Sequence, residues 1–190
     1  MKEFKIVRKI IDGDLLDFLG TYAYNKAKTS GVPRVETHGY EDSQIPNTPG
    51  DYGDYVMENL LGFLSSRMEE YTGLTLLPTY SYYRVYKQGD ILHSHKDRPS
   101  CEISVSICLK RNRGQDIWPL YIETSKTNKV LLEEGDGLIY RGSEFSHWRD
   151  EFNCGNNLAQ AFLHYVDANG PNTKWFNDNR PQPNYFIQEY

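Results

Sequence analysis

The chain has 190 residues, enough for one domain that buries its own core without disulfides or structural metals. Charged residues make up 25% and hydrophobic residues 38% of the sequence, which is typical of a folded globular chain and excludes a disordered one. The net charge of -5 argues against nucleic acid as an obligate partner, because phosphate backbones favour a basic face.

The sequence has no feature of secretion or membrane insertion. Its first residues alternate charged and apolar side chains, and no apolar run approaches the ~20 residues that a membrane span needs. The cysteines Cys101, Cys108 and Cys154 have no paired spacing, so a disulfide framework is not expected. We therefore expect a reducing, cytoplasmic compartment and no membrane partner.

The first part of the chain carries helical patterns. Asp12 or Asp14 can cap a helix whose apolar residues recur at a spacing near 3.6 as far as Tyr22. Residues 33–50 are rich in Pro, Gly, Thr, Asn and Asp, which predicts a long loop. A second helix is predicted from about Tyr52 to Tyr71.

After Gly73 the apolar residues recur with period two, which predicts strands. Strands with Gly, Asn or Asp turns between them favour a mainly β sandwich or barrel with helices packed outside. We expect a single domain over 1–190. It would comprise an N-terminal helical part over 1–72, a β core over 75–168 and an irregular tail over 169–190. The predicted strands are 79–86, 102–110, 118–123, 129–132, 137–141 and 157–166.

Three potential metal ligands stand next to these strands. His95 and Asp97 are two residues apart, so on an extended chain they face the same side. His147 follows the predicted strand 137–141 and can supply a third ligand. Two imidazoles and one carboxylate on one face leave coordination positions open, as in the facial triad of Fe(II) oxygenases. His95, Asp97 and His147 are therefore the predicted ligands of a non-haem Fe(II) centre.

A different metal site uses His93. In that reading His93, His95 and His147 hold zinc or manganese, and Asp97 only caps a turn. The protein would then be a cupin-like isomerase or binding module that does not use 2-oxoglutarate.

The motifs around the ligands are similar to those of the Fe(II)/2-oxoglutarate-dependent dioxygenases. The segment YRVYKQG (83–89) precedes His95-x-Asp97, and EGDGLIY (134–140) precedes His147. Over 75–168 the sequence resembles most closely the prolyl-4-hydroxylase-like branch, which includes phage-encoded members. The resemblance implies a double-stranded β-helix, or jelly-roll, core.

The resemblance also implies a reaction. Fe(II), 2-oxoglutarate and O₂ would give succinate, CO₂ and a hydroxylated substrate, with ascorbate as a candidate reductant. Related halogenases have a small residue in place of the carboxylate ligand, so Asp97 favours hydroxylation. A peptidyl, prolyl-like substrate follows from the branch, and a small molecule is the alternative. Loop 33–50, with Tyr40, and the aromatic tail are candidate substrate covers, although surface packing also accounts for them.

The chain departs from this branch where the far carboxylate of 2-oxoglutarate is held. Prolyl hydroxylases use an Arg or Lys nine or ten residues after the distal His, but this chain has Asn156 and Asn157 there. A buried dicarboxylate still needs a cation or several donors.

Three residues can replace the missing cation. Lys110 ends the face Ser104, Ser106, Cys108, and related branches anchor 2-oxoglutarate with a Lys from this strand; a solvent-facing Lys110 is the alternative. Arg149 lies two residues after His147 and should share its face, unless it pairs at the surface with a neighbouring acid.

Tyr86 matches a family Tyr that donates its phenol to 2-oxoglutarate, and Arg84 on the same strand face is a further candidate cation. Gln160 and His164 share a face of strand 157–166, where His164 reads as a structural histidine.

Overall fold

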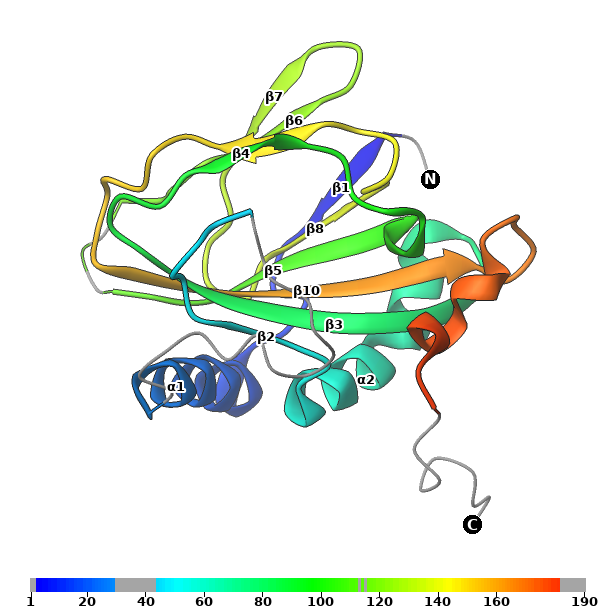
Figure 1. The fold of residues 1–190 in the computed structure, drawn as a ribbon, viewed down its shortest axis with the longest axis horizontal. Helices are drawn as coiled ribbons and strands as arrows, with labels where there is room; N and C mark the ends of the chain where they lie inside the picture. Colours follow the sequence, from blue (N-terminus) through cyan, green and yellow to red (C-terminus); the bar gives the residue numbers. More distant parts are fainter. Residues whose placement is uncertain (1–2, 30–43, 113, 115, 182–190) are drawn as a thin grey trace.

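The computed structural model describes residues 3–29, 44–112, 114 and 116–181, which form two facing antiparallel sheets (Figure 1). The major sheet has the order β1 (Phe4–Val7), β8 (Gly137–Tyr140), β5 (Ile103–Arg111), β10 (Asn157–Asp167), β3 (Leu76–Lys87) and β2 (Gly50–Tyr52). The minor sheet has the order β4 (Leu92–His95), β9 (His147–Arg149), β6 (Leu120–Glu123) and β7 (Thr127–Val130).

Two helices, α1 (Gly13–Thr29) and α2 (Tyr55–Thr72), cover the outer face of the major sheet (Figure 1). The Asp54 carboxylate begins α2 by accepting hydrogen bonds from the backbone N–H groups of Val56 and Met57. Gly73 ends it with a left-handed φ of 72°, which a residue without Cβ adopts cheaply. Local capping therefore sets both ends of the helix that supports β3.

Alternate side chains of β5 belong to two separate hydrophobic cores. Ile103, Val105 and Ile107 are fully buried against the helices. On the opposite face Cys108 joins the core between the two sheets, and Ser106 is buried on the same face. Burying each large aliphatic side chain stabilises the fold by about 1.5–3 kcal/mol. The helix-side core fixes the major sheet, so its inner face is free to carry polar groups.

A β-bulge interrupts this alternation at the end of β5. Strand β10 pairs Gln160 with Cys108 and Ala159 with Lys110, so Leu109 is the extra residue. Leu109 packs in the helix-side core, and a Cβ on Gly20 of α1 would stand 2.7 Å from Lys110 Cβ. The predicted face of Lys110 is therefore wrong, because the bulge turns it away from the space between the sheets.

The mainly β fold with flanking helices is confirmed, and both predicted helices are present. Four short strands, β1, β2, β4 and β9, were not predicted, and β1 and β2 belong to the part of the chain expected to be helices and loop. In the tail, η2 (Thr173–Asn179) is a 3₁₀ segment. Tyr40, most of loop 33–50 and residues 182–190 lie outside the described residues.

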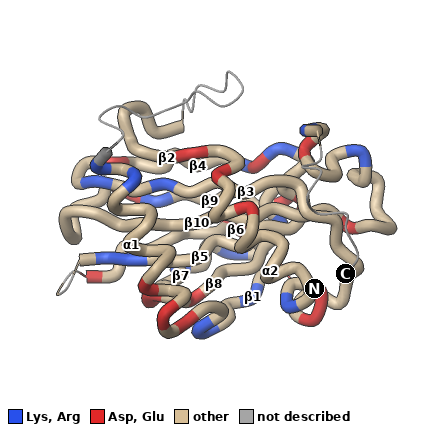
Figure 2. Tube along the Cα trace, turned by 90° about the horizontal axis from the view of Figure 1, so that it is seen from below, with Lys and Arg blue, Asp and Glu red and all other residues tan. Residues whose placement is uncertain are grey.

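Within the described part of the chain, no helix is both long and apolar enough to cross a membrane. Acidic and basic positions are interspersed in the view of Figure 2.

Candidate metal centre

The structure brings together the three predicted ligands. His95 ends β4, Asp97 follows it by two residues, and His147 begins β9. Their ligand atoms lie within 4.8 Å of one another. Asp97 Oδ1 is 3.5 Å from His95 Nε2 and 3.6 Å from His147 Nε2. Three donors this close, with both Nε2 atoms directed at one carboxylate oxygen, can converge on a single cation.

Both imidazoles are held in the tautomer that a metal requires. His95 Nδ1 lies 2.8 Å from the carbonyl of His93, and His147 Nδ1 lies 3.0 Å from the carbonyl of Phe145. A carbonyl only accepts, so each Nδ1 carries the hydrogen and donates it. Nε2, the nitrogen nearer Asp97, is therefore the atom through which each imidazole can bind a metal.

Burial and charge act differently on the three ligands. Burial lowers the pKa of His147 below its ordinary value, although Asp97 opposes this. Burial also acts against a charged His95, but hydrogen bonds to Asp97 and to the His93 carbonyl raise its pKa. Burial disfavours a charged Asp97, yet the hydrogen bond with His95 and the neighbouring imidazoles hold its pKa below the usual range. The carboxylate is therefore ionised, as a metal ligand must be.

Asp97 Oδ2 is buried and has no hydrogen-bond partner among the described residues. An unpaired buried carboxylate oxygen is costly, so its presence fits a site built for a cation. The Asp97 backbone N–H donates to the Gly142 carbonyl at 2.9 Å. A Cβ on Gly142 would overlap Oδ2 and would lie 2.8 Å from the Cys101 carbonyl oxygen. Gly142 therefore leaves the space that the carboxylate occupies.

The geometry does not favour the site built on His93. The His93 side chain is exposed and does not belong to either cluster of potential ligands found among the described residues. Its backbone carbonyl instead orients His95. Two imidazoles with one carboxylate, a ligand set that leaves coordination positions open, suit Fe(II).

Arg149 lies on the same strand as His147, two residues further, and is 3% exposed. It donates to the Trp118 carbonyl at 2.6 Å and to Gln160 Oε1 at 2.8 Å, and its guanidinium lies 4.6 Å from the Trp118 ring centroid. Burial lowers the pKa of Arg149 from its ordinary value. Among the described residues, no carboxylate lies within ion-pair distance of it.

Tyr86 lies under this guanidinium, whose centre is 5.9 Å from the Tyr86 ring. The ring is fully buried and contacts Trp118 edge-on, at 5.0 Å between centroids. Its hydroxyl is buried and has no hydrogen-bond partner among the described residues. A buried cation without a counter-charge beside an unused hydroxyl donor fits a carboxylate ligand.

The other candidate anchors are placed elsewhere. Lys110 Nζ is bonded to Thr21 of α1 at 3.0 Å, on the helix side of the sheet. Asn156 is exposed, and Asn157 begins β10 opposite Lys87. Arg84 lies on the inner face of β3, with its guanidinium 5.2 Å from the Tyr82 ring and 5.5 Å from the Tyr86 ring.

Three residues near the site were not predicted to act there. Gln160 links Arg149 to the Ser106 hydroxyl, and Trp118 holds the other side of the guanidinium. Tyr140, fully buried, places its hydroxyl 3.4 Å from His147 Nε2. Only the shared face of Ser106 and Cys108 hinted at a polar wall, and no local pattern marks Trp118.

Gly142→Ala should weaken metal binding about 10–100-fold, because the added methyl group would displace the Asp97 carboxylate. Gly142 itself is not a ligand, so the effect would be indirect. Titration with Co(II), followed by its visible absorption, measures the affinity. Gly62→Ala is the matched control, since a Cβ there meets nothing within 4 Å. Equal affinities in the two variants would contradict the assigned role of Gly142.

His164 should make the metal-free protein less stable in acid. Burial lowers its folded pKa from 6.5 to about 4, so the unfolded chain binds the proton more readily. Stability is therefore lost as pH falls from 6.5 toward 4, by up to about 3 kcal/mol. Urea unfolding at pH 7 and pH 5 should show a smaller loss for His164→Gln than for the wild type. Parallel losses would refute this assignment.

Neither known family models nor curated proteins match this sequence. Solved structures match across most of the chain. A prolyl-4-hydroxylase of Pseudomonas putida superposes with a TM-score of 0.63 and 14% identity, covering 86% of this chain and 92% of that one. A prolyl hydroxylase of Trichoplax adhaerens, in complex with a hypoxia-inducible factor peptide, gives 0.65 and 14%, covering 88% and 84%.

HygX of Streptomyces hygroscopicus, with nickel and 2-oxoglutarate bound, gives a TM-score of 0.62 at 11% identity, covering 87% of this chain and 83% of that one. At these identities the likeness concerns the fold. The predicted jelly-roll core is thereby confirmed, and the chain has the fold of the Fe(II)- and 2-oxoglutarate-dependent oxygenases.

Proposed function

We propose that this protein is an oxygenase dependent on Fe(II) and 2-oxoglutarate, which hydroxylates a peptidyl, prolyl-like or small-molecule substrate and releases succinate and CO₂. His95, Asp97 and His147 would hold the metal. Arg149 and Tyr86 would hold the far carboxylate of 2-oxoglutarate. The proposal joins a fold shared with such oxygenases to two sets of polar groups. Among the described residues, Asp97 Oδ2 in the first set and the Tyr86 hydroxyl in the second have no hydrogen-bond partner, and Arg149 has no carboxylate partner.

The observation that carries the proposal is Arg149. An ionised guanidinium is normally kept in contact with water or paired, because burying a lone charge costs several kcal/mol. Here it is buried on the same strand face as the ligand His147, and no described carboxylate pairs with it. A metal-binding protein that used no anionic co-substrate would have no need of this cation.

Different side chains would bind the metal and the carboxylate of 2-oxoglutarate. When bound, Fe(II) would supply the oxidative chemistry with 2-oxoglutarate and O₂. Asp97 contributes a negative charge, while His95 and His147 present neutral Nε2 lone pairs. Arg149 can clasp a carboxylate bidentately, and Gln160 and the Trp118 carbonyl hold its orientation. The Trp118 and Phe152 rings, 4.8 Å apart, keep water from this end of the site.

A peptide or small-molecule substrate is supported by the inner faces of β2, β3 and β10. Tyr52, Tyr80 and Tyr82 line these strands, with Tyr82 next to Phe162 at 6.2 Å between ring centroids. Aromatic rings give a large contact area and a polar tip, which suits a peptide or a ring-containing small molecule. The peptide in the Trichoplax structure supports the first of these choices.

Purified protein supplied with Fe(II), 2-oxoglutarate and ascorbate should form succinate slowly even without substrate, and Asp97→Ala should abolish it. Succinate is measured by NMR under air, with an anaerobic sample as control. If the protein forms no succinate and binds zinc tightly, the alternative of a cupin-like protein without 2-oxoglutarate replaces the proposal.

Arg149→Gln should raise the 2-oxoglutarate concentration needed for half-maximal binding about 100-fold, because it removes the charge that meets the buried carboxylate. Binding is measured by thermal shift in the presence of Mn(II). Arg149→Lys should recover part of the loss, and Mn(II) affinity should stay unchanged throughout.

Lys110→Ala is the matched control, since Lys110 faces α1. If Lys110→Ala raises the requirement for 2-oxoglutarate while Arg149→Gln does not, the anchor has been assigned to the wrong residue.

A further inference from the structure

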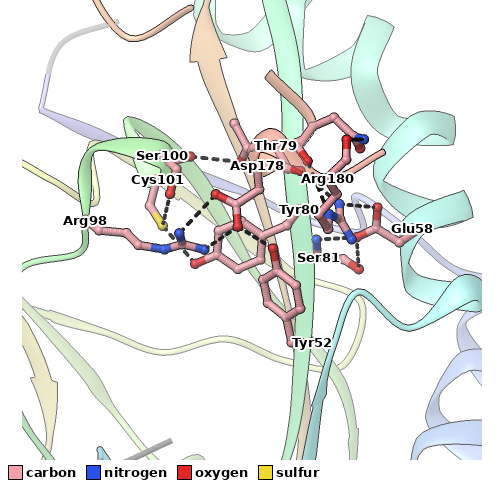
Figure 3. Close-up of polar contacts among 11 residues, drawn as sticks. Tyr52, Glu58, Thr79, Tyr80, Ser81, Arg98, Ser100, Cys101, Asp178 and Arg180 are labelled. Carbon is pink, nitrogen blue, oxygen red and sulfur yellow. Dashed lines mark hydrogen bonds and ion pairs between the residues drawn. The ribbon is translucent and has the colours of Figure 1, made fainter. Parts of the chain in front are cut away.

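The segment that follows β10, Thr173–Arg180, lies beside the beginning of β3 and the end of β10 (Figure 1). We call this segment the strap. None of the residues of η2 is buried, so polar contacts hold it in place. Arg180 bonds to Glu58 at 2.8 Å and to the Thr79 carbonyl at 3.0 Å (Figure 3). Segments with few buried apolar contacts open at low free-energy cost.

The second attachment of the strap is a carboxylate bound to Arg98. Asp178 accepts two parallel hydrogen bonds from the guanidinium, at 3.0 and 2.7 Å (Figure 3). The Tyr52 hydroxyl donates to the same carboxylate. The guanidinium also lies 4.5 Å from the centre of the Tyr80 ring. Arg98, Tyr52 and Tyr80 thus form a fitted carboxylate receptor, with the Asp178 side chain 6% exposed in it.

This receptor is adjacent to the metal ligands. Arg98 directly follows Asp97 in the sequence. The Tyr80 hydroxyl lies 3.1 Å from Cys101 Sγ, and its ring is tilted against the His164 ring, with 4.5 Å between the centroids (Figure 3 shows Tyr80 and Cys101). Cys101 and His164 in turn form a cluster with Asp97 in which the ligand atoms lie within 4.8 Å of one another. Only one layer of side chains separates the receptor from the metal centre.

The backbone of the strap is strained where it delivers the carboxylate. Asn177, Asp178 and Asn179 have consecutive φ values of 52°, 52° and 57°, in the left-handed region that L-residues occupy at a cost. Residues with a Cβ are disfavoured in this region, although Asn and Asp tolerate it best. The contact of Asp178 with Arg98 offsets this strain, so a competing carboxylate would release it.

We propose that Arg98, with Tyr52 and Tyr80, binds a carboxylate group of the substrate, and that Asp178 is the built-in occupant that this group displaces. The inference rests on the proposed function and narrows its substrate to one that carries a carboxylate. The strap then closes the receptor in the absence of substrate and opens as the substrate binds.

The first test removes the Asp178 carboxylate from the receptor. Asp178→Ala should lower the melting temperature of the metal-free protein by several degrees, and acetate should restore it with saturation at millimolar concentrations. Chloride at the same ionic strength should not. In Arg98→Gln/Asp178→Ala the effect of acetate should vanish, although Arg149 remains, which separates the two cations. An identical response to acetate in the single and double variants overturns the proposal.

Two further variants sharpen the result. Asp178→Asn keeps the size of the side chain and an acceptor for Tyr52, and it should show the same dependence on Arg98 if Asp178→Ala does not fold. Glu144→Ala is the matched control, because it removes the carboxylate partner of another arginine, Arg141. Saturable rescue of Glu144→Ala by acetate would mean that any surface arginine gives the effect, and the proposal would fail.

Displacement is tested in the wild type by hydrogen exchange of the strap amides. N-acetylproline should accelerate their exchange several-fold, and its neutral amide, N-acetylprolinamide, should not. Equal exchange with both would make Asp178 a fixed structural contact and overturn the proposal. These measurements need no iron, so they hold whether or not the protein forms succinate, and failure of one proposal is distinguished from failure of the other.

Discussion

The pairing of β4 with β9 sets His95 directly opposite His147, and the rest of the site depends on this register. In antiparallel strands, facing residues project to the same side of the sheet. The same pairing sets Leu92 opposite Arg149, so the candidate ligand His147 and the buried Arg149 face the interior together. A slip of one residue would turn both toward solvent. Two very short strands therefore decide whether His147 and Arg149 point into the space between the sheets.

The register is enforced by the major sheet and not by the short strands themselves. Strands of three or four residues have little intrinsic stability. They are held because Leu92 and Trp118 belong to the core between the sheets, whose other wall comes from β3, β5, β8 and β10. Helices α1 and α2 stabilise that wall from behind. The two helices thus affect the positions of the candidate ligands only by supporting the major sheet.

The interior contains several buried polar side chains that contact one another. Arg149, Gln160 and Ser106 form a buried chain of hydrogen bonds that is satisfied except for a counter-charge. Together with Tyr86 Oη and Asp97 Oδ2 it stores a free-energy cost that an anion and a cation bound side by side would remove. The protein should therefore be measurably more stable with a cation and an anion bound than without them.

Much of this was predictable from the sequence, and the failures have local physical causes. Alternation places His95 and Asp97 on one side, and the same rule places Arg149 beside His147. It fails at Lys110 because a bulge at Leu109 shifts the period, and no residue type announces that bulge. Strands as short as β4 and β9 carry too few residues for a periodic signal. Trp118 comes from a distant segment, so its contact with Arg149 depends on the tertiary fold.

The turn between β8 and β9 orients two of the candidate ligands, so its sequence and length are constrained. In this turn the Gly142 carbonyl accepts a hydrogen bond from the Asp97 N–H, and the Arg141 carbonyl accepts one from the Phe145 N–H. The carbonyl of Phe145 in turn orients His147. Inserting residues there would uncouple two ligands at once, so selection should hold its length constant. The segment after β10 contacts Arg98, which follows Asp97, and makes none of the hydrogen bonds that orient His95, Asp97 or His147. The end of the chain can therefore change in sequence while the hydrogen bonds that orient His95, Asp97 and His147 stay the same.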